Sequence, residues 1–265
     1  MPWVDNTLII VEGPQDAAVV QVLLCDQGFE AQKFYQNIPE YWQRLIPRKF
    51  PHGVTGDIME PHPVPLFLKH PQTAWACVVK AKGYPNLPQT VVDTLGALDR
   101  LPDALGIAVD ADRRGGQGTR TDLVNRLLRL LPESAQTVFG SLGDTIVERR
   151  SEHRRGLYVF PDNHSEGTLE KLILEGGQLN YPNLLRHAEK YIREMPEDIL
   201  PDSVELKEFR RLPDDKMVIH AMTTVLKPSL AIQNSIRDNM WLKGGSLTRP
   251  LVAGFLKFLK DLMEQ

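Results

Sequence analysis

Residues 7–14 read TLIIVEGP, a run of apolar and β-branched side chains that stops at a glutamate and a glycine. An unbroken apolar run of this kind predicts a β-strand that is buried on both faces, as the strands of a parallel sheet are. Pro14 suits the first turn of a helix, and apolar residues then continue at helical spacing until Gly28 ends the pattern. This segment therefore predicts a strand followed by a helix, with Glu12 at the junction.

Three more apolar runs of the same type follow, at residues 74–79, 105–109 and 156–160. Amphipathic helices are predicted at residues 87–101 and 123–131, and a further helix begins after Thr168, its expected N-cap. Strand and helix thus alternate four times. This alternation favours an α/β fold with a four-stranded parallel sheet and helices on both of its faces.

Two parts of the chain lie outside this alternation. Residues 30–72 are rich in proline and show no sustained period, so we expect an inserted irregular lobe with helical structure only near residues 39–45. After Tyr181 there is no further strand pattern, and a helical C-terminal segment is expected, with helices at residues 182–195, 214–226 and 247–263. The predicted division is a sheet domain at residues 1–29 and 73–180, an insertion at 30–72 and a helical segment at 181–265.

Composition limits the function classes. The 265 residues include 31 Lys and Arg against 34 Asp and Glu, a net charge of −3, which excludes a generally basic nucleic-acid coat but not a local basic patch. No apolar run approaches the roughly 18 residues of a membrane span, so we expect a soluble, cytoplasmic protein without a membrane partner. Cys25 and Cys77 lie in apolar runs and are expected to be buried thiols.

Acidic residues follow two of the predicted strands. In open α/β sheets, ligands bind at the carboxyl ends of the strands, where Glu12 follows the first strand and Asp110 and Asp112 follow the third. Two residues apart in an extended chain, Asp110 and Asp112 would point to the same face, and Asp16 could reach Glu12 from the first helical turn. Converging carboxylates repel one another, and Mg²⁺ (or Mn²⁺) would relieve the repulsion and leave positions for phosphate. The alternative is an ordinary Asp-x-Asp turn or N-cap.

These residues resemble a known family. Residues 11–16, VEGPQD, are similar to the V-E-G-x-x-D motif of the Toprim domain, and residues 109–112, VDAD, are similar to its D-x-D motif. Toprim domains occur in bacterial primases, type IA and type II topoisomerases, ribosomal-RNA maturases and OLD-family nucleases. The resemblance covers residues 7–174 without the insertion. It implies a Rossmann-like Toprim catalytic domain that binds Mg²⁺ through Glu12, Asp110 and Asp112 for phosphodiester chemistry.

The resemblance also implies individual roles. Glu12 would be a metal ligand or a general acid/base acting through water, Asp110 and Asp112 would be catalytic metal ligands, and Asp16 would support them. Residues 167–170, GTLE, are similar to a segment that supplies a further acid in maturases and OLD-like nucleases, so Glu170 would bind a second metal ion. The alternative is that Glu170 completes a helix cap with Thr168.

Two basic stretches could contact phosphate. Residues 113–120, RRGGQGTR, follow the Asp pair and are expected to form a mobile basic flap, or else a solvated loop. Residues 149–155, RRSEHRR, offer a second phosphate footprint, or else a solvated linker. The expected nucleic-acid contacts are Arg113, Arg114, Arg120, Arg149, Arg150 and Lys227.

The predicted helix at residues 214–226 carries Lys216, His220, Thr223 and Lys227 on one polar face. OLD-like nucleases use a lysine downstream of the Toprim strands to stabilise transition-state charge. The resemblance therefore implies a catalytic lysine on this face, for which Lys216 and Lys227 are the candidates, with Lys216 preferred; the alternative is that either one is a surface lysine. The remaining histidines show no metal-ligand spacing, which disfavours zinc.

The leading expectation is a Mg²⁺-dependent nuclease that hydrolyses DNA or RNA, with anti-phage defence as the setting that OLD-like proteins suggest. A topoisomerase needs a tyrosine on a separate domain, and a primase needs a template module; neither is found. Because the chain has no Walker motif, an alternative is a non-catalytic or partner-dependent effector subunit that acts with a separate ATPase. A further alternative treats residues 110–112 as a haloacid-dehalogenase phosphatase motif. The oligomeric state stays open.

Overall fold

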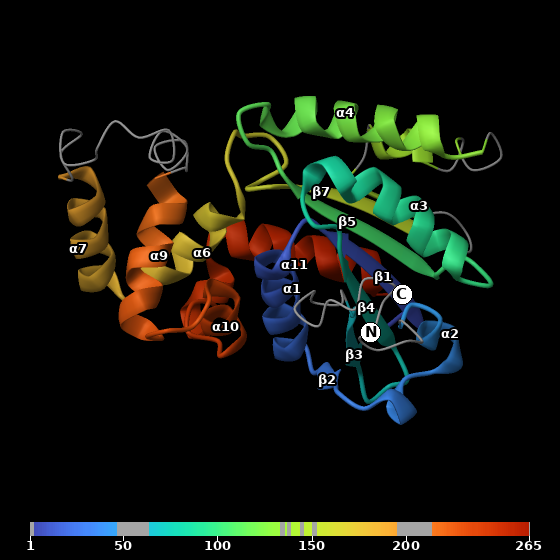
Figure 1. Ribbon diagram of the computed structural model, residues 1–265, viewed down its shortest axis with the longest axis horizontal. Coiled ribbons are helices and arrows are strands. Elements are labelled where there is room, and N and C mark those ends of the chain that lie inside the picture. Colours follow the sequence, from blue (N-terminus) through green and yellow to red (C-terminus); the bar gives the residue numbers. More distant parts are fainter. Residues whose placement is uncertain are drawn as a thin grey trace, which may run out of the picture.

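The computed structural model describes residues 3–46, 64–132, 136, 139–143, 146–149, 153–194 and 214–264. Within them, the chain forms a mixed α/β fold around one seven-stranded sheet of order β2-β3-β4-β1-β5-β7-β6 (Figure 1). The strands are β1 (Asn6–Val11), β2 (Glu30–Gln32), β3 (Leu66–Lys69), β4 (Trp75–Lys80), β5 (Ala104–Asp110), β6 (Val147–Arg149) and β7 (Arg154–Phe160). Strands β4, β1, β5 and β7 run parallel, whereas β2, β3 and β6 extend the sheet through antiparallel pairs.

The central strand β1 shows why an apolar run was needed. Leu8 and Ile10 belong to one hydrophobic core and Ile9 and Val11 to the other, and all four side chains are fully buried. Because successive side chains of a strand point to opposite faces, a strand with a core on each side must be apolar throughout. The prediction of a largely parallel sheet covered on both faces is confirmed.

Helices cover both faces of the sheet (Figure 1). Helices α3 (Leu87–Ala97) and α4 (Gly115–Leu130) contribute to one core, and α1 (Pro14–Asp26), α6 (Leu169–Asn180) and α11 (Pro250–Met263) contribute to the other. The described residues also form the helices α2 (Glu40–Gln43), α7 (Pro182–Arg193), α9 (Asp214–Leu226) and α10 (Ile232–Arg237). Within the described part of the chain, no helix has the length and apolar character needed to cross a membrane.

The sheet is wider than the four strands expected from the sequence. The four predicted strands correspond to β1, β4, β5 and β7, and the additional strands have only three or four residues each. Such short strands carry too few residues for a period to be recognised. Two of them, β2 and β3, lie at the ends of the region expected to be an irregular lobe, so both ends of that region belong to the sheet edge. Residues 47–63, the middle of that lobe, lie outside the described residues.

The C-terminal helix α11 returns to the sheet and shares its core. Gly106 and Gly156 are paired on β5 and β7 beneath this helix. A Cβ atom at Gly106 would lie 2.6 Å from Leu262, and one at Gly156 would lie 2.6 Å from Phe258. The two glycines therefore allow α11 to pack directly on the strands, and the expected C-terminal segment does not form a core of its own.

One expectation about the thiols is wrong. Cys77 is buried on β4, as expected, but Cys25 is exposed near the end of α1. Cys25 lies in an apolar run, but Val22, Leu23 and Leu24 are the last buried residues of α1, and the next position along the helix places Cys25 at the surface.

Candidate active site

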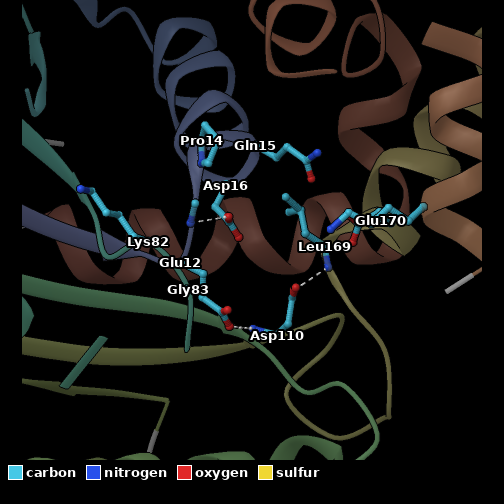
Figure 2. Close-up of a pocket in the computed structure, with 11 residues that line it drawn as sticks. Glu12, Pro14, Gln15, Asp16, Lys82, Gly83, Asp110, Leu169 and Glu170 are labelled. Atoms are coloured by element: carbon cyan, nitrogen blue, oxygen red, sulfur yellow. Dashed lines mark hydrogen bonds and ion pairs between the residues drawn. The ribbon is translucent and has the colours of Figure 1, made fainter. Parts of the chain in front are cut away.

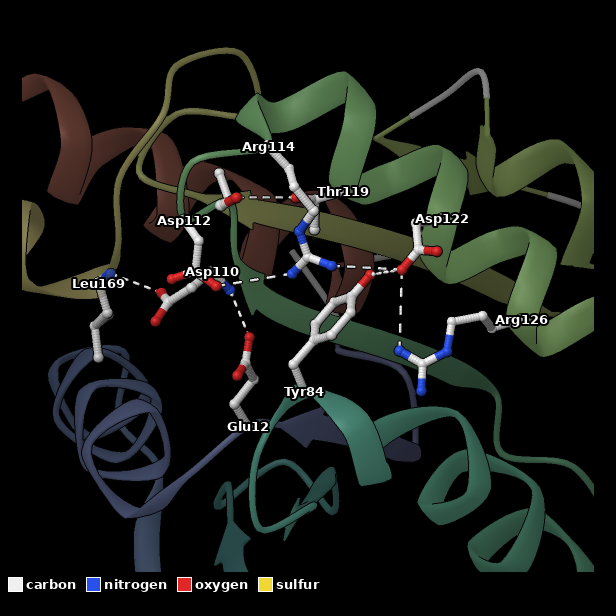
Figure 3. Close-up of polar contacts among 10 residues, drawn as sticks. Glu12, Tyr84, Asp110, Asp112, Arg114, Thr119, Asp122, Arg126 and Leu169 are labelled. Carbon is white, nitrogen blue, oxygen red and sulfur yellow. Dashed lines mark hydrogen bonds and ion pairs between the residues drawn. The ribbon is translucent and has the colours of Figure 1, made fainter. Parts of the chain in front are cut away.

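Strands β1 and β5 end side by side at the point where the chain changes direction across the sheet. From β1 the chain crosses to the side of the sheet formed by β2, β3 and β4, and from β5 it crosses to the side formed by β7 and β6. Such a switch point is where open α/β sheets bind ligands. Glu12 directly follows β1 and Asp110 ends β5, and the backbone N–H of Asp110 donates a hydrogen bond to Oε1 of Glu12 at 2.8 Å (Figure 3).

An acidic cavity of about 290 Å³ opens at this switch point. Four carboxylates line it: Glu12 after β1, Asp16 in the first turn of α1, Asp110 on β5 and Glu170 in the first turn of α6 (Figure 2). Residues 16 and 170 thus join the two strand-end acids because α1 and α6 both begin at the carboxyl edge of the sheet. The structure therefore brings together four of the five acids that the sequence analysis singled out.

The first turns of the two helices hold these carboxylates in place. The backbone N–H of Gly13 donates to Oδ2 of Asp16 at 2.9 Å, and the backbone N–H of Leu169 donates to Oδ1 of Asp110 at 2.8 Å (Figure 2). The N–H groups at a helix start have no partner within the helix and carry partial positive charge. They are therefore suited to fix buried acids at this edge.

Burial and mutual repulsion raise the pKa values of three acids in the cavity, Glu12, Asp16 and Asp110. Burial first, and then the charges of Glu12 and Glu170, raise the pKa of Asp16 to about 7. Burial, followed by the charges of Asp16, Glu170 and Glu12, raises the pKa of Asp110 well above its ordinary value. Burial also raises the pKa of Glu12, although the backbone hydrogen bond from Asp110 opposes the rise. A buried group of interacting acids with raised pKa values is typical of functional sites.

Lys216 reaches the cavity from α9. Its Nζ lies 3.9 Å from Oε1 of Glu170, whose side chain is only 5% exposed. Thr168 stands at the N-cap of α6 but makes no side-chain capping hydrogen bond within the described residues, so the capping alternative for Glu170 is not observed. Lys227 does not line the cavity. It lies just beyond the end of α9, where its Nζ pairs with Asp238 at 2.6 Å.

Asp112 does not line the cavity with Asp110, so the expectation that both point to one face is wrong. The chain turns at Asp112, whose φ of 50° lies in the left-handed region, and the extended geometry assumed from the spacing is therefore lost. Its backbone exchanges two hydrogen bonds of 2.8 Å with Gly167. Its side chain is 55% exposed and lies 3.7 Å from an Arg114 nitrogen.

The expected basic flap is the first turn of α4. Gly115, Gly116 and Gly118 are helical, and a Cβ atom at Gly116 would lie 2.0 Å from the carbonyl oxygen of Asn163. This glycine thus serves close packing between α4 and the loop after β7, rather than close approach to a ligand. Arg113 and Arg114 precede the helix and are exposed.

Arg120 is a structural residue, which corrects its expected role in nucleic-acid binding. It is 4% exposed, and its guanidinium donates to the backbone oxygens of Leu142 at 2.9 Å and Leu157 at 2.8 Å and to Oδ1 of Asn163 at 3.1 Å. A guanidinium surrounded in this way is not accessible to a phosphate.

The second basic stretch lies at the opposite end of the sheet. Arg149 pairs with Arg154 at the start of β7, whereas Asp110 pairs with Phe160 at its end. Arg149 contacts Asp261, with 3.7 Å between the guanidinium and the carboxylate. The structure therefore does not bring Arg149 to the acidic cavity, and Arg150 lies outside the described residues.

Sequence reasoning missed Lys82, which lines the cavity from the turn after β4, and Tyr84, a neighbour of the site in the same turn. Tyr84 lies next to Glu12, and the guanidinium of Arg114 lies 3.9 Å above its ring (Figure 3). In the sequence, Tyr84 stands between a glycine and a proline, a stretch that predicts only a turn. The signal that could have found it is its place at the carboxyl end of a predicted strand adjacent to β1.

The cavity offers carboxylate oxygens, which are the donors that hard cations such as Mg²⁺ prefer. As the side chains stand in the described part of the chain, no group of three or more His, Cys, Asp or Glu is arranged to hold a metal ion. Each of Glu12, Asp16 and Asp110 has one oxygen bonded to a backbone N–H. Their second oxygens are the ones that a cation would draw together.

Comparison with known proteins gives one result. A family model described as "Protein of unknown function (DUF3226)" matches residues 6–264, which include the sheet, the acidic cavity and the C-terminal helices. No curated protein and no solved structure matches the chain.

Proposed function

The chain belongs to the DUF3226 family, and we propose that it is a Mg²⁺-dependent nuclease of the Toprim type that hydrolyses phosphodiester bonds of DNA or RNA. The observation that carries the proposal is the contact between Glu12 and Asp110 at the switch point of the sheet, inside a cavity that two further carboxylates and Lys216 also line. Such a site suits phosphodiester hydrolysis, because negative charge develops on the phosphate while a water molecule attacks.

The residues present fit a divalent cation. Glu12 and Asp110 would be its first ligands, with Asp16 and Glu170 beside them, and the raised pKa values of Glu12 and Asp110 express how unfavourable the negative charges are without one. When bound, Mg²⁺ would lower the pKa of a coordinated water and stabilise charge on the phosphate. Asp112 would join the ligands only after its side chain turns away from Arg114.

The remaining parts of the site would act on the substrate. The ammonium group of Lys216 lies at the cavity wall, where it can stabilise negative charge on a phosphate oxygen. The helix starts at Gly13 and Leu169 hold one oxygen of Asp16 and one oxygen of Asp110, which leaves the second oxygen of each carboxylate to move toward a cation.

The test is cleavage of labelled DNA and RNA by the purified chain with Mg²⁺ or Mn²⁺. Glu12→Gln and Asp110→Asn keep the size of each side chain and remove its charge, and both are expected to abolish cleavage. Asp99→Asn is the matched control, because Asp99 pairs with Arg44 at the surface. Cleavage that survives both site substitutions would overturn the proposal. A chain that binds Mg²⁺ but cleaves only with an added ATPase subunit would favour the partner-dependent alternative.

A further inference from the structure

Next to the acidic cavity, four side chains form a stacked cluster: Tyr84, Arg114, Asp122 and Arg126 (Figure 3). The guanidinium of Arg114 lies 3.9 Å from the ring centroid of Tyr84, and that of Arg126 lies 5.2 Å from it. The hydroxyl group of Tyr84 donates to Oδ2 of Asp122 at 2.6 Å. The ring is thus fixed by Asp122 and carries a guanidinium on its face.

Stacking, rather than a close ion pair, orients Arg114. Its nearest carboxylate distances are 3.5 Å to Asp122 and 3.7 Å to Asp112, longer than the roughly 2.7–2.9 Å of charge-assisted hydrogen bonds. The side chain is also 38% exposed. A guanidinium aligned on a ring, with its N–H groups only weakly engaged by carboxylates, is well suited to bind a phosphate through two hydrogen bonds.

Tyr84 links this cluster to the proposed metal ligands. Burial is the main cause that raises the pKa of Glu12, and backbone hydrogen bonds from Asp110 and Tyr84 and the charge of Arg114 oppose the rise. The backbone of Tyr84 therefore contacts Glu12 while its ring supports Arg114. Lys216 approaches the cavity from α9, and Arg114 approaches from the start of α4.

We propose that Arg114, oriented by the ring of Tyr84, binds a phosphate of the nucleic acid beside the one that is cleaved, and that Tyr84 and Asp122 are positioning residues. This inference rests on the proposed function, since it assigns the substrate contact of the same site. Asp112, the anion nearest to one edge of the guanidinium, then gives way to the substrate phosphate.

The experiment measures binding separately from cleavage. A fluorescein-labelled DNA hairpin and an RNA hairpin of the same sequence are titrated with the full chain in Ca²⁺, which replaces Mg²⁺, at several salt concentrations. Arg114→Ala is expected to weaken binding about ten- to a hundredfold. It should also reduce the slope of log K against log salt by about 0.7–0.9, the contribution of one phosphate contact. Arg114→Lys keeps the charge and should keep the slope while losing part of the affinity.

Variants of Tyr84 test the positioning role. Tyr84→Leu removes the ring and should weaken binding nearly as much as Arg114→Ala. Tyr84→Phe keeps the ring but loses the hydrogen bond to Asp122, so its affinity should lie between those of Tyr84→Leu and the parent chain. Because Tyr84 acts through Arg114, the double variant Tyr84→Leu/Arg114→Ala should bind no more weakly than Arg114→Ala alone. A merely structural role of Tyr84 would instead give additive losses and an unchanged salt slope.

Arg100 provides a matched control. Its guanidinium lies 5.0 Å from the ring of Tyr41 and pairs with Asp103 just before β5, at the end of the sheet opposite the cavity. Arg100→Ala should leave the affinity and the salt slope unchanged.

The outcomes separate the two proposals. If Arg114→Ala binds more weakly and with a smaller salt slope but the parent chain shows no Mg²⁺-dependent cleavage, the phosphate contact of Arg114 is supported and the nuclease proposal is overturned. If the parent chain cleaves and both Arg114→Ala and Tyr84→Leu bind as it does, only the phosphate contact of Arg114 is overturned. A parent chain that binds neither hairpin would also overturn the phosphate contact.

Discussion

The backbone N–H of Asp110 and the carboxylate of Glu12 are joined by a 2.8 Å hydrogen bond across 98 positions of sequence. This bond fixes the end of β5 against the end of β1, and with it two partly buried carboxyl groups at short range. The hydrogen bond stabilises the folded chain, whereas repulsion between the two carboxylates destabilises it. Such a site lowers the free energy of unfolding unless a bound cation offsets the repulsion.

Charge removal at this contact should therefore stabilise the metal-free chain. Glu12→Gln and Asp110→Asn each keep an oxygen that can accept the backbone N–H of Asp110 or Leu169. At pH 8 in EDTA, we expect each variant to unfold at a higher temperature than the parent chain, by about 2–4 °C for each kcal/mol of repulsion relieved. Mg²⁺ should raise the Tm of the parent chain and have little effect on either variant. Scanning fluorimetry with and without Mg²⁺ measures both effects, and a lower Tm of both variants in EDTA would contradict the prediction.

The stability of the metal-free chain should also fall as the pH rises. Burial and the charge of Glu12 raise the pKa of Asp16 from its ordinary value of 3.8 to about 7. An acid with a higher pKa in the folded chain stabilises folding fully below its unfolded pKa, and this contribution is lost as the pH rises through the folded pKa. Between about pH 4 and pH 7, the parent chain should therefore lose stability relative to Asp16→Asn.

Thermal unfolding of the two proteins in EDTA at half-unit pH steps measures this difference. Mg²⁺ should restore the parent chain most strongly at the upper end of the range, where the acids are charged. A Tm difference between the parent chain and Asp16→Asn that does not vary with pH would show that Asp16 titrates normally.

Two glycines of α4 should respond oppositely to alanine. A Cβ atom at Gly116 would meet the Asn163 carbonyl oxygen at 2.0 Å, so Gly116→Ala must displace the loop after β7 and should cost about 1–3 kcal/mol or more. A Cβ atom at Gly118 would lie 3.6 Å from the Cβ atom of Arg114, an ordinary contact. Gly118→Ala should therefore stabilise the helix by about 0.5–1 kcal/mol. Urea unfolding measures both changes; equal small effects would mean that residues 115–118 are not packed as a helix.

The sequence was sufficient for the parts of the fold that rest on long, regular patterns. The runs at β1, β4, β5 and β7 are apolar because each strand has a core on both sides, and that condition can be recognised without coordinates. The short strands β2, β3 and β6 are held by pairing to longer neighbours rather than by their own composition. Their presence depends on tertiary structure, which a local pattern does not contain.

The site was predictable to the extent that strand ends determine it. Glu12 and Asp110 could be placed together because parallel strands end at one edge of a sheet. The orientation of Asp112 depends on a single left-handed residue, and the burial of Arg120 depends on backbone oxygens supplied by β7 and by residues 140–143. Both features arise from contacts between segments far apart in the chain, so residue type alone pointed to a metal ligand at Asp112 and to a phosphate contact at Arg120.

Lys216 should matter for catalysis and not for metal binding. Its ammonium lies 3.9 Å from Glu170, so Lys216→Met removes a positive charge from the cavity wall and leaves the four carboxylates in place. The affinity for Mg²⁺ should then stay the same or increase, because a competing cation is gone. The value of kcat for phosphodiester cleavage should fall about 10²–10³-fold if the ammonium stabilises charge in the transition state.

Lys227→Met is the control, because Lys227 directly follows α9. Lys227 pairs with Asp238 at 2.6 Å, away from the residues that line the cavity, and its removal should change kcat less than about threefold. Single-turnover cleavage and calorimetric titration with Mg²⁺ separate the two effects. Equal losses in both variants, or a loss of Mg²⁺ affinity that accounts for the lower rate of Lys216→Met, would remove Lys216 from the catalytic group and leave it as a partner of Glu170.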